Sequence, residues 1–254
     1  MSTRKPFIIG IGGAHSSVGK TSLAAAIIRF FTSHQSVSPF GKQPRLGAIK
    51  YTRTPLYASL VEDESLIGLE RKDTARLSGA GAEKVLWIQS PRTDLEEIVT
   101  VALSRLADLD VIVIEGNSAI EFAKPDIVIF IIGETEKSIK PSAQKLSSQA
   151  DIIIVPDAAW TVRLVSMTSA KIHAVKDYPY VFDDEAIQVI ISFMEEIVKK
   201  KEIERMLKER AIDARITCTA ARMIAEELSV SYSEVGNAAN ELKIKINNCE
   251  LGCF

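Results

Sequence analysis

A short glycine-containing turn near the amino terminus constrains this chain more than any other feature of its sequence. The apolar stretch 7–13 leads directly into the turn, and residues 14–21 read Ala-His-Ser-Ser-Val-Gly-Lys-Thr. This is the pattern of a phosphate-binding loop, with Ala14 at the position where the first glycine is usual. The strongly helix-forming segment 22–31 follows, so the turn stands between a strand and a helix.

The residue types in this loop suit the binding of a polyphosphate. Backbone N–H groups wrap the phosphates, and a side chain at Gly19 would hold the backbone away from them. Lys20 places a positive charge between the β- and γ-phosphates, and the Thr21 hydroxyl completes the coordination shell of a Mg²⁺ ion. The N-terminal end of the following helix favours the same anion. We therefore expect a nucleotide site formed by Gly13, Ala14, His15, Ser16, Ser17, Val18, Gly19, Lys20, Thr21 and Ser22.

Three polar residues inside the loop have less certain roles from sequence alone. His15 either contacts a phosphate or substrate anion, or is simply exposed. Ser16 and Ser17 have no partners that suggest a nucleophile triad, so we expect their hydroxyl groups to bind phosphate.

The composition limits the class of protein. The chain has 254 residues, a length between one domain and two full ones. A net charge of −2 and a pI near 6.0 give no support for nucleic-acid binding. No apolar stretch approaches the roughly 18 residues of a membrane span, and the first residues lack the apolar core of a secretory signal. We expect a cytoplasmic protein that binds neither nucleic acid nor membrane.

Short apolar stretches alternate with helical patterns as far as about residue 200. The apolar stretches are continuous, which is typical of strands covered on both faces of a sheet. The expected strands are 7–11, 46–50, 85–88, 111–114, 127–132, 152–155 and 171–175, and the expected helices are 20–34, 73–79, 93–107, 141–149 and 184–201. This alternation predicts an α/β fold of the P-loop NTPase type, with a doubly wound, mostly parallel sheet.

The charged stretch 199–215 is the best candidate for a domain boundary, so we expect an NTPase domain over 1–200 and a small helical module over 201–254. Two helices, 217–228 and 231–242, and a short strand at 243–246 follow in an order typical of a winged helix. A capping box at Ser231 and Glu234 is expected to open the second of these helices. Residues 200–254 carry nine Lys and Arg against nine Asp and Glu, and the second helix has no basic residue. DNA binding by this module is therefore not expected.

Three charged side chains end or follow the central strands. Lys50 closes the second strand, Glu115 closes the strand 111–114, and Asp73 lies beyond the second strand. Parallel strands end at the edge where the phosphate loop lies. We expect Lys20, Lys50, Asp73 and Glu115 to be catalytic, and Thr21, Asp73 and Glu115 to hold Mg²⁺. The alternatives are an ordinary strand-end carboxylate, a solvated lysine and, at Asp73, a helix N-cap.

The cysteines all lie near the carboxyl terminus, at Cys218, Cys249 and Cys253. An odd number in a cytosolic protein argues against a disulfide framework. They could form a zinc or Fe–S site that needs a fourth ligand, or they are thiols of a small packing module.

The order of four motifs resembles the MobB family, the P-loop proteins of molybdopterin-guanine dinucleotide biosynthesis. The motifs are the loop at 14–21, Ala-Ile-Lys-Tyr-Thr at 48–52, Lys-Asp-Thr-Ala-Arg-Leu-Ser-Gly-Ala-Gly-Ala at 72–82 and the Val-Ile-Glu-Gly strand end at 113–116. The chain departs from the family pattern at Tyr51 and Arg53, where the family has histidines, and at Arg71, where it has glycine.

The MobB resemblance implies GTP rather than ATP, Mg²⁺, weak hydrolysis, and assistance to the enzyme that attaches a nucleotide to molybdopterin. Its partners would be molybdopterin and cofactor-maturation proteins, and a homodimer is left open. The residues themselves do not distinguish GTP from ATP.

The loop is also similar to that of dethiobiotin synthetases and cobyrinate amide synthases. Those families also place a lysine, an aspartate and a Val-Glu-Gly carboxylate around ATP and Mg²⁺, which implies the same roles for Lys50, Asp73 and Glu115. The alternatives to the MobB function are therefore an ATP-dependent carboxylate-activating ligase and a nucleotide-gated adaptor for metalloenzyme maturation, in which hydrolysis acts only as a timer.

Overall fold

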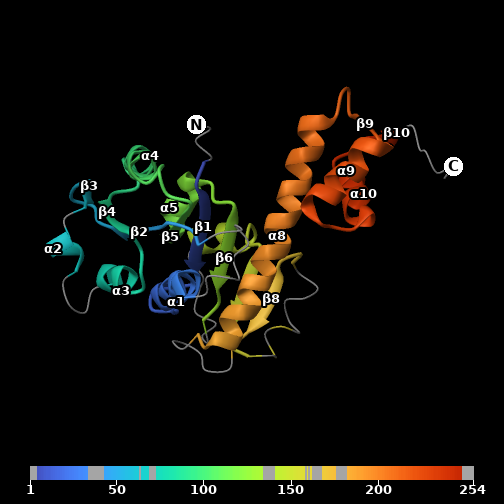
Figure 1. Ribbon diagram of the computed structural model, residues 1–254. Helices are drawn as coiled ribbons and strands as arrows, with labels where there is room; N and C mark the ends of the chain where they lie inside the picture. Colours follow the sequence, from blue (N-terminus) through green and yellow to red (C-terminus); the bar gives the residue numbers. More distant parts are fainter. Residues whose placement is uncertain are drawn as a thin grey trace. The chain divides into compact units, whose positions relative to one another are not determined.

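The computed structural model describes residues 5–33, 43–62, 64–68, 73–133, 141–157, 159, 161, 168–175 and 182–247. The chain divides into two compact units, Met1–Ile191 and Ser192–Phe254. The division falls inside one long helix, α8 (Asp184–Arg210), coloured orange in Figure 1. Each unit has its own layers and core.

The first unit is built on an eight-stranded sheet with the order β3-β4-β2-β5-β1-β6-β7-β8. Every neighbouring pair is parallel except β3 and β4, which are antiparallel. The strands are β1 (Phe7–Gly13), β2 (Leu46–Arg53), β3 (Ser59–Val61), β4 (Lys84–Ser90), β5 (Val111–Glu115), β6 (Ile127–Ile131), β7 (Ile152–Val155) and β8 (Lys171–Ala174). The predicted α/β fold with a mostly parallel sheet is confirmed; the short edge strand β3 was not predicted.

Helices cover both faces of this sheet, as the continuous apolar strands predicted. Figure 1 shows α4 and α5 over one face and α1 and α3 over the other. The helices are α1 (Lys20–Ser33), α2 (Glu64–Ile67), α3 (Asp73–Gly79), α4 (Leu95–Arg105), α5 (Asn117–Ala123) and α6 (Pro141–Ser147). Every residue of the central strands β5 and β6 is buried. The sequence pattern missed α5, because this helix is short and follows directly on β5.

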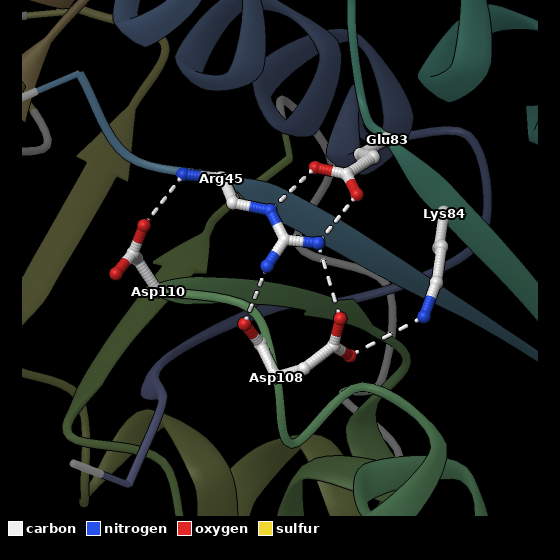
Figure 2. Close-up of polar contacts among 5 residues, drawn as sticks. All are labelled: Arg45, Glu83, Lys84, Asp108 and Asp110. Atoms are coloured by element: carbon white, nitrogen blue, oxygen red, sulfur yellow. Dashed lines mark hydrogen bonds and ion pairs between the residues drawn. The ribbon is translucent and has the colours of Figure 1, made fainter. Parts of the chain in front are cut away.

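An ion-pair network joins the amino ends of three strands, at the edge of the sheet opposite to the phosphate loop (Figure 2). The Arg45 guanidinium donates to both oxygens of Glu83, at 3.0 and 2.6 Å, and to Asp108 at 3.1 Å. The backbone N–H of Arg45 donates to Asp110 at 2.9 Å. Hydrogen bonds from Arg45 hold the pKa values of Glu83 and Asp108 below their usual range. The network therefore ties together the segments that begin β2, β4 and β5.

Helix α8 continues through the charged stretch that the sequence suggested as a boundary. Arg205 pairs with Glu202 at 2.6 Å, three residues before it, and with Glu209 at 2.5 Å, four residues after it. Such pairs lie on one face of a helix and stabilise it, so a run of mixed charge need not interrupt one. The predicted boundary at residue 200 thus lies inside this helix.

The second unit contains β9 (Arg215–Thr217), α9 (Cys218–Leu228), α10 (Tyr232–Glu241) and β10 (Lys245–Asn247). Strands β9 and β10 pair in parallel. The predicted capping box at Ser231 and Glu234 is confirmed, since each side chain accepts the backbone N–H of the other. Residues of α8, α9 and α10 close a separate apolar core around Ile224 and Leu207. None of the helices in the described ranges is both long and apolar enough to cross a bilayer.

Candidate active site

The phosphate loop connects the end of β1 to the start of α1. Gly13 is the last residue of β1 and Lys20 the first of α1. Gly19 has φ of 90°, a conformation that side chains disfavour, which is a second reason for glycine at this position. Ser17 has φ of 63° without being glycine. The loop backbone is thus held in a conformation that a free chain seldom adopts.

Two basic side chains of the loop pack against its own backbone. The Lys20 ammonium donates to the carbonyl oxygen of His15 at 3.0 Å, and His15 Nδ1 lies 2.9 Å from the Ser16 carbonyl oxygen. His15 Nε2 is buried and has no hydrogen-bond partner among the described residues. The imidazole lies against Gly133, where any side chain would collide with it. His15 is therefore not simply exposed, and its imidazole packs against Gly133, two residues after β6.

The structure brings together four side chains for which the sequence predicted catalytic or metal-binding roles. They are Thr21, Lys50, Asp73 and Glu115. The Lys50 ammonium lies 2.6 Å from Glu115 and 2.7 Å from Asp73. The Thr21 hydroxyl donates to the second oxygen of Glu115 at 2.7 Å. Sheet register produces this cluster, because Lys50 on β2 is the direct partner of Glu115 on β5. Asp73 reaches it from the first turn of α3.

This donor set suits a Mg²⁺ ion. Magnesium prefers oxygen ligands, usually one or two carboxylates with waters and phosphate oxygens. Glu115 and Asp73 already converge on one cationic group, the Lys50 ammonium. Burial works to raise the pKa of Asp73, but the hydrogen bond and charge of Lys50, with smaller contributions from Thr21 and Arg76, together lower that pKa below its usual value. Asp73 is thus ionised at neutral pH, as a metal ligand must be.

Asn117, which the sequence reasoning missed, clamps the start of the loop. Its side-chain oxygen accepts the Gly13 N–H at 2.9 Å, and its side-chain amide donates to the Gly13 carbonyl oxygen at 2.9 Å. Both bonds span more than a hundred residues of sequence, since Asn117 opens α5 directly after β5. The sequence did carry one indication of this role, because Asn117 lies two residues beyond Glu115, at the edge of the sheet where β5 ends.

Arg76 is a second residue that the sequence did not single out. It lies on α3, one turn after Asp73, and donates to the Ser22 hydroxyl at 2.9 Å. Residues three apart share a helix face, so Arg76 and Asp73 approach the loop from the same side.

These groups surround an open cavity of about 670 Å³. That volume falls in the range of small-molecule sites. The cavity is lined by Gly13, Ala14, His15, Ser16, Ser17, Gly19, Lys20, Thr21, Ser22, Lys50, Tyr51, Thr52, Arg53, Asp73, Arg76, Glu115, Gly116, Asn117 and Ser118. Of the predicted nucleotide-binding residues only Val18 is absent from the lining; it is fully buried, packed where a side chain on Gly13 would stand.

The predicted cysteine site gains no support. Cys218 is half-buried at the start of α9, and it is a free thiol. Cys249 and Cys253 lie outside the described residues. The described ranges contain no group of three or more His, Cys, Asp or Glu side chains placed to hold a metal ion.

Comparisons with known proteins give distant structural similarities. No family model matches this chain, and no curated protein matches it. The chain is similar to the signal recognition particle 54 kDa protein from Aeropyrum pernix K1, solved with GDP, at 13% identity and a TM-score of 0.44. That alignment covers 94% of this chain and 77% of the other.

Two further solved structures are similar at the same level. LpxK from Aquifex aeolicus, solved with ATP, is 15% identical with a TM-score of 0.40, over 89% of this chain and 69% of the other. A plasmid partition protein from Borrelia burgdorferi is 14% identical with a TM-score of 0.42, over 78% of this chain and 100% of the other. None of these similarities assigns the chain to a family, so the resemblance to the MobB family stays a prediction.

Proposed function

We propose that this chain is a Mg²⁺-dependent P-loop NTPase that binds a nucleoside triphosphate. One observation carries the proposal: the side chains of Asp73, Glu115 and, at 3.4 Å, Thr21 all contact the Lys50 ammonium directly beside the phosphate loop. Two carboxylates and a hydroxyl around one position form a set that a divalent cation would use.

Each side chain has a distinct part in this proposal. The loop N–H groups and Lys20 would hold the β- and γ-phosphates. Asn117 would keep the loop backbone in place through its two hydrogen bonds to Gly13. Thr21, Asp73 and Glu115 would hold the Mg²⁺ ion, directly or through its waters, and the ion would neutralise charge on the phosphates. Lys50 would then be available to the terminal phosphate.

The finer proposal is a role in molybdenum cofactor biosynthesis with GTP as the nucleotide. It rests on the order of the four motifs that resemble the MobB family. Two of these motifs supply Lys50 and Glu115, which are neighbours in the folded chain.

The competing proposal, an ATP-dependent ligase, is favoured by the same Lys50 position and by the loop sequence. A carboxylate-dependent release of ADP would favour the ligase; nucleotide-dependent capture of a maturation protein, with no such release, would favour the adaptor.

The decisive experiment compares nucleotide binding with and without Mg²⁺ for Glu115→Gln and Asp73→Asn. Calorimetry with a non-hydrolysable triphosphate should show an affinity loss of about tenfold or more in Mg²⁺ and little change in EDTA, because only the metal ligand is removed. Lys20→Ala, which removes the charge at the phosphates, should abolish binding in both conditions.

Asp94→Asn is the matched control, because Asp94 precedes α4 and its side chain makes no capping bond. Equal losses with and without Mg²⁺ in Glu115→Gln and Asp73→Asn would mean that the carboxylates act through folding, and the metal assignment would fall.

A further inference from the structure

A second cavity, of about 380 Å³, lies beside the nucleotide cavity between helices α1 and α3. We call it the α1–α3 groove; small residues of both helices form part of its lining. Gly79 on α3 has open space where a side chain would stand. Phe182, which precedes α8, adds an aromatic wall. The groove therefore has room and apolar surface for a small organic molecule.

Two arginines are the only charged side chains among the described residues that line this groove. Arg29 on α1 and Arg76 on α3 both line it, and neither forms an ion pair with any described residue. Other arginines of the chain, such as Arg45, Arg92 and Arg105, each pair with a carboxylate. Two like charges around one hollow repel each other, and an oxyanion between them would remove that repulsion. A planar guanidinium also matches phosphate and carboxylate groups geometrically.

The groove is continuous with the nucleotide site through shared residues. Arg76 and Ser22 line both cavities, and Arg76 donates to the Ser22 hydroxyl at 2.9 Å. Ser22 directly follows Thr21 in α1, so a molecule in the groove would lie next to the loop end that carries the metal-binding hydroxyl.

We propose that the α1–α3 groove binds a second substrate, a small organic oxyanion with an apolar body, between Arg29 and Arg76. This inference deepens the proposed function and rests on it, because the groove matters for catalysis only if a nucleotide occupies the neighbouring cavity. The anionic group is a phosphate or a carboxylate, and Phe182 packs against the apolar part.

The test uses the full chain saturated with a non-hydrolysable triphosphate and Mg²⁺, so that the phosphate loop is filled. Phenyl phosphate, benzoate and benzyl alcohol are titrated separately by NMR or calorimetry. We expect one or both oxyanions to bind and the neutral alcohol to bind far more weakly. Arg29→Gln should weaken oxyanion binding about fivefold, as expected for one exposed charge, and should leave triphosphate affinity unchanged. Lys5→Gln, which removes a charge before β1, is the matched control and should change neither.

The outcomes separate this inference from the proposed function. Failure of the triphosphate to bind the unmodified protein overturns the proposed function, whatever the probes do. Triphosphate binding without oxyanion binding overturns only the proposal that the groove binds a second substrate. The same proposal is overturned if benzyl alcohol binds as tightly as the oxyanions. It is also overturned if Arg29→Gln and Lys5→Gln lose the same oxyanion affinity. Preference for phenyl phosphate or for benzoate identifies the anionic group.

Discussion

At the scale of single residues, the Lys50 ammonium contacts both carboxylates of the site, Glu115 at 2.6 Å and Asp73 at 2.7 Å. The Glu115 side chain is only 3% exposed, so leaving its carboxylate without a cationic partner would lower the free energy of unfolding. The Asp73 side chain is nearly half exposed, so water solvates its carboxylate and the ion pair with Lys50 contributes less to stability. The buried pair with Glu115 should therefore contribute more to stability than the exposed pair with Asp73.

Lys50→Gln should destabilise the metal-free protein by about 2 kcal/mol, because it leaves a buried carboxylate without a cation. Mg²⁺ with a triphosphate should restore a large part of this loss, since a ligand that binds only the folded state stabilises it. Urea unfolding in EDTA and in Mg²⁺ measures both effects. Lys145→Gln, which breaks an exposed pair with Glu121, is the control and should change stability little. Equal destabilisation in both buffers would contradict a metal-binding role for these carboxylates.

At the scale of elements, the carboxyl ends of the central strands position the site and their amino ends carry the ion-pair network. Asn117 at the start of α5 joins β5 to the loop after β1 through two bonds to Gly13. Arg45 joins the segments before β2, β4 and β5. Both devices hold neighbouring segments in register, one at each end of the sheet.

Asn117→Ala removes both bonds to Gly13 and should lower triphosphate affinity about tenfold, because the loop backbone loses its fixed position. Calorimetry well below the unfolding temperature measures this effect separately from stability. Asn240→Ala, at an exposed position on α10, should leave the affinity unchanged. Loss of stability without loss of affinity would show that the clamp is structural only.

Arg45→Gln should lower the Tm modestly at pH 7 and low salt. The pKa values of Glu83 and Asp108 are lowered by folding, so both groups stabilise the folded state above their ordinary pKa values. That contribution is lost as the pH falls below about 4, so the difference between variant and parent should shrink there.

Thermal unfolding across pH, at low and high salt, checks the expectation for Arg45→Gln. Lys84→Gln, which loses one 3.3 Å contact to Asp108, should show a smaller effect. A pH-independent difference between Arg45→Gln and the parent would show that the guanidinium contributes through packing instead.

At the scale of the whole molecule, the residues of the proposed site all come from the first unit. The second unit has its own apolar core, in which Ile224 is fully buried. Ile224→Ala should cost about 2–4 kcal/mol of unfolding free energy, because it leaves a cavity. Triphosphate affinity should not change. Met223→Ala, at the exposed neighbouring position, is the matched control for stability. A fall in affinity with Ile224→Ala would show that the two units act together in binding.

Much of the fold could be read from local sequence patterns. Continuous apolar stretches predicted seven of the eight strands of the sheet, and the capping box at Ser231 and Glu234 predicted the start of α10. The loop at 14–21 predicted a phosphate site because its chemistry depends on consecutive residues. These features are local, since the periodicity of burial and the spacing of a loop are visible within a few residues.

The tertiary structure alone decided which residues meet. Strand order places β2 beside β5, and register then sets Lys50 opposite Glu115. The Asn117 clamp and the α1–α3 groove arise in the same way, from segments that are distant in the chain. Pairing between distant strands depends on hydrogen bonds and packing across the whole sheet, and side-chain periodicity carries no information about which neighbour a strand selects.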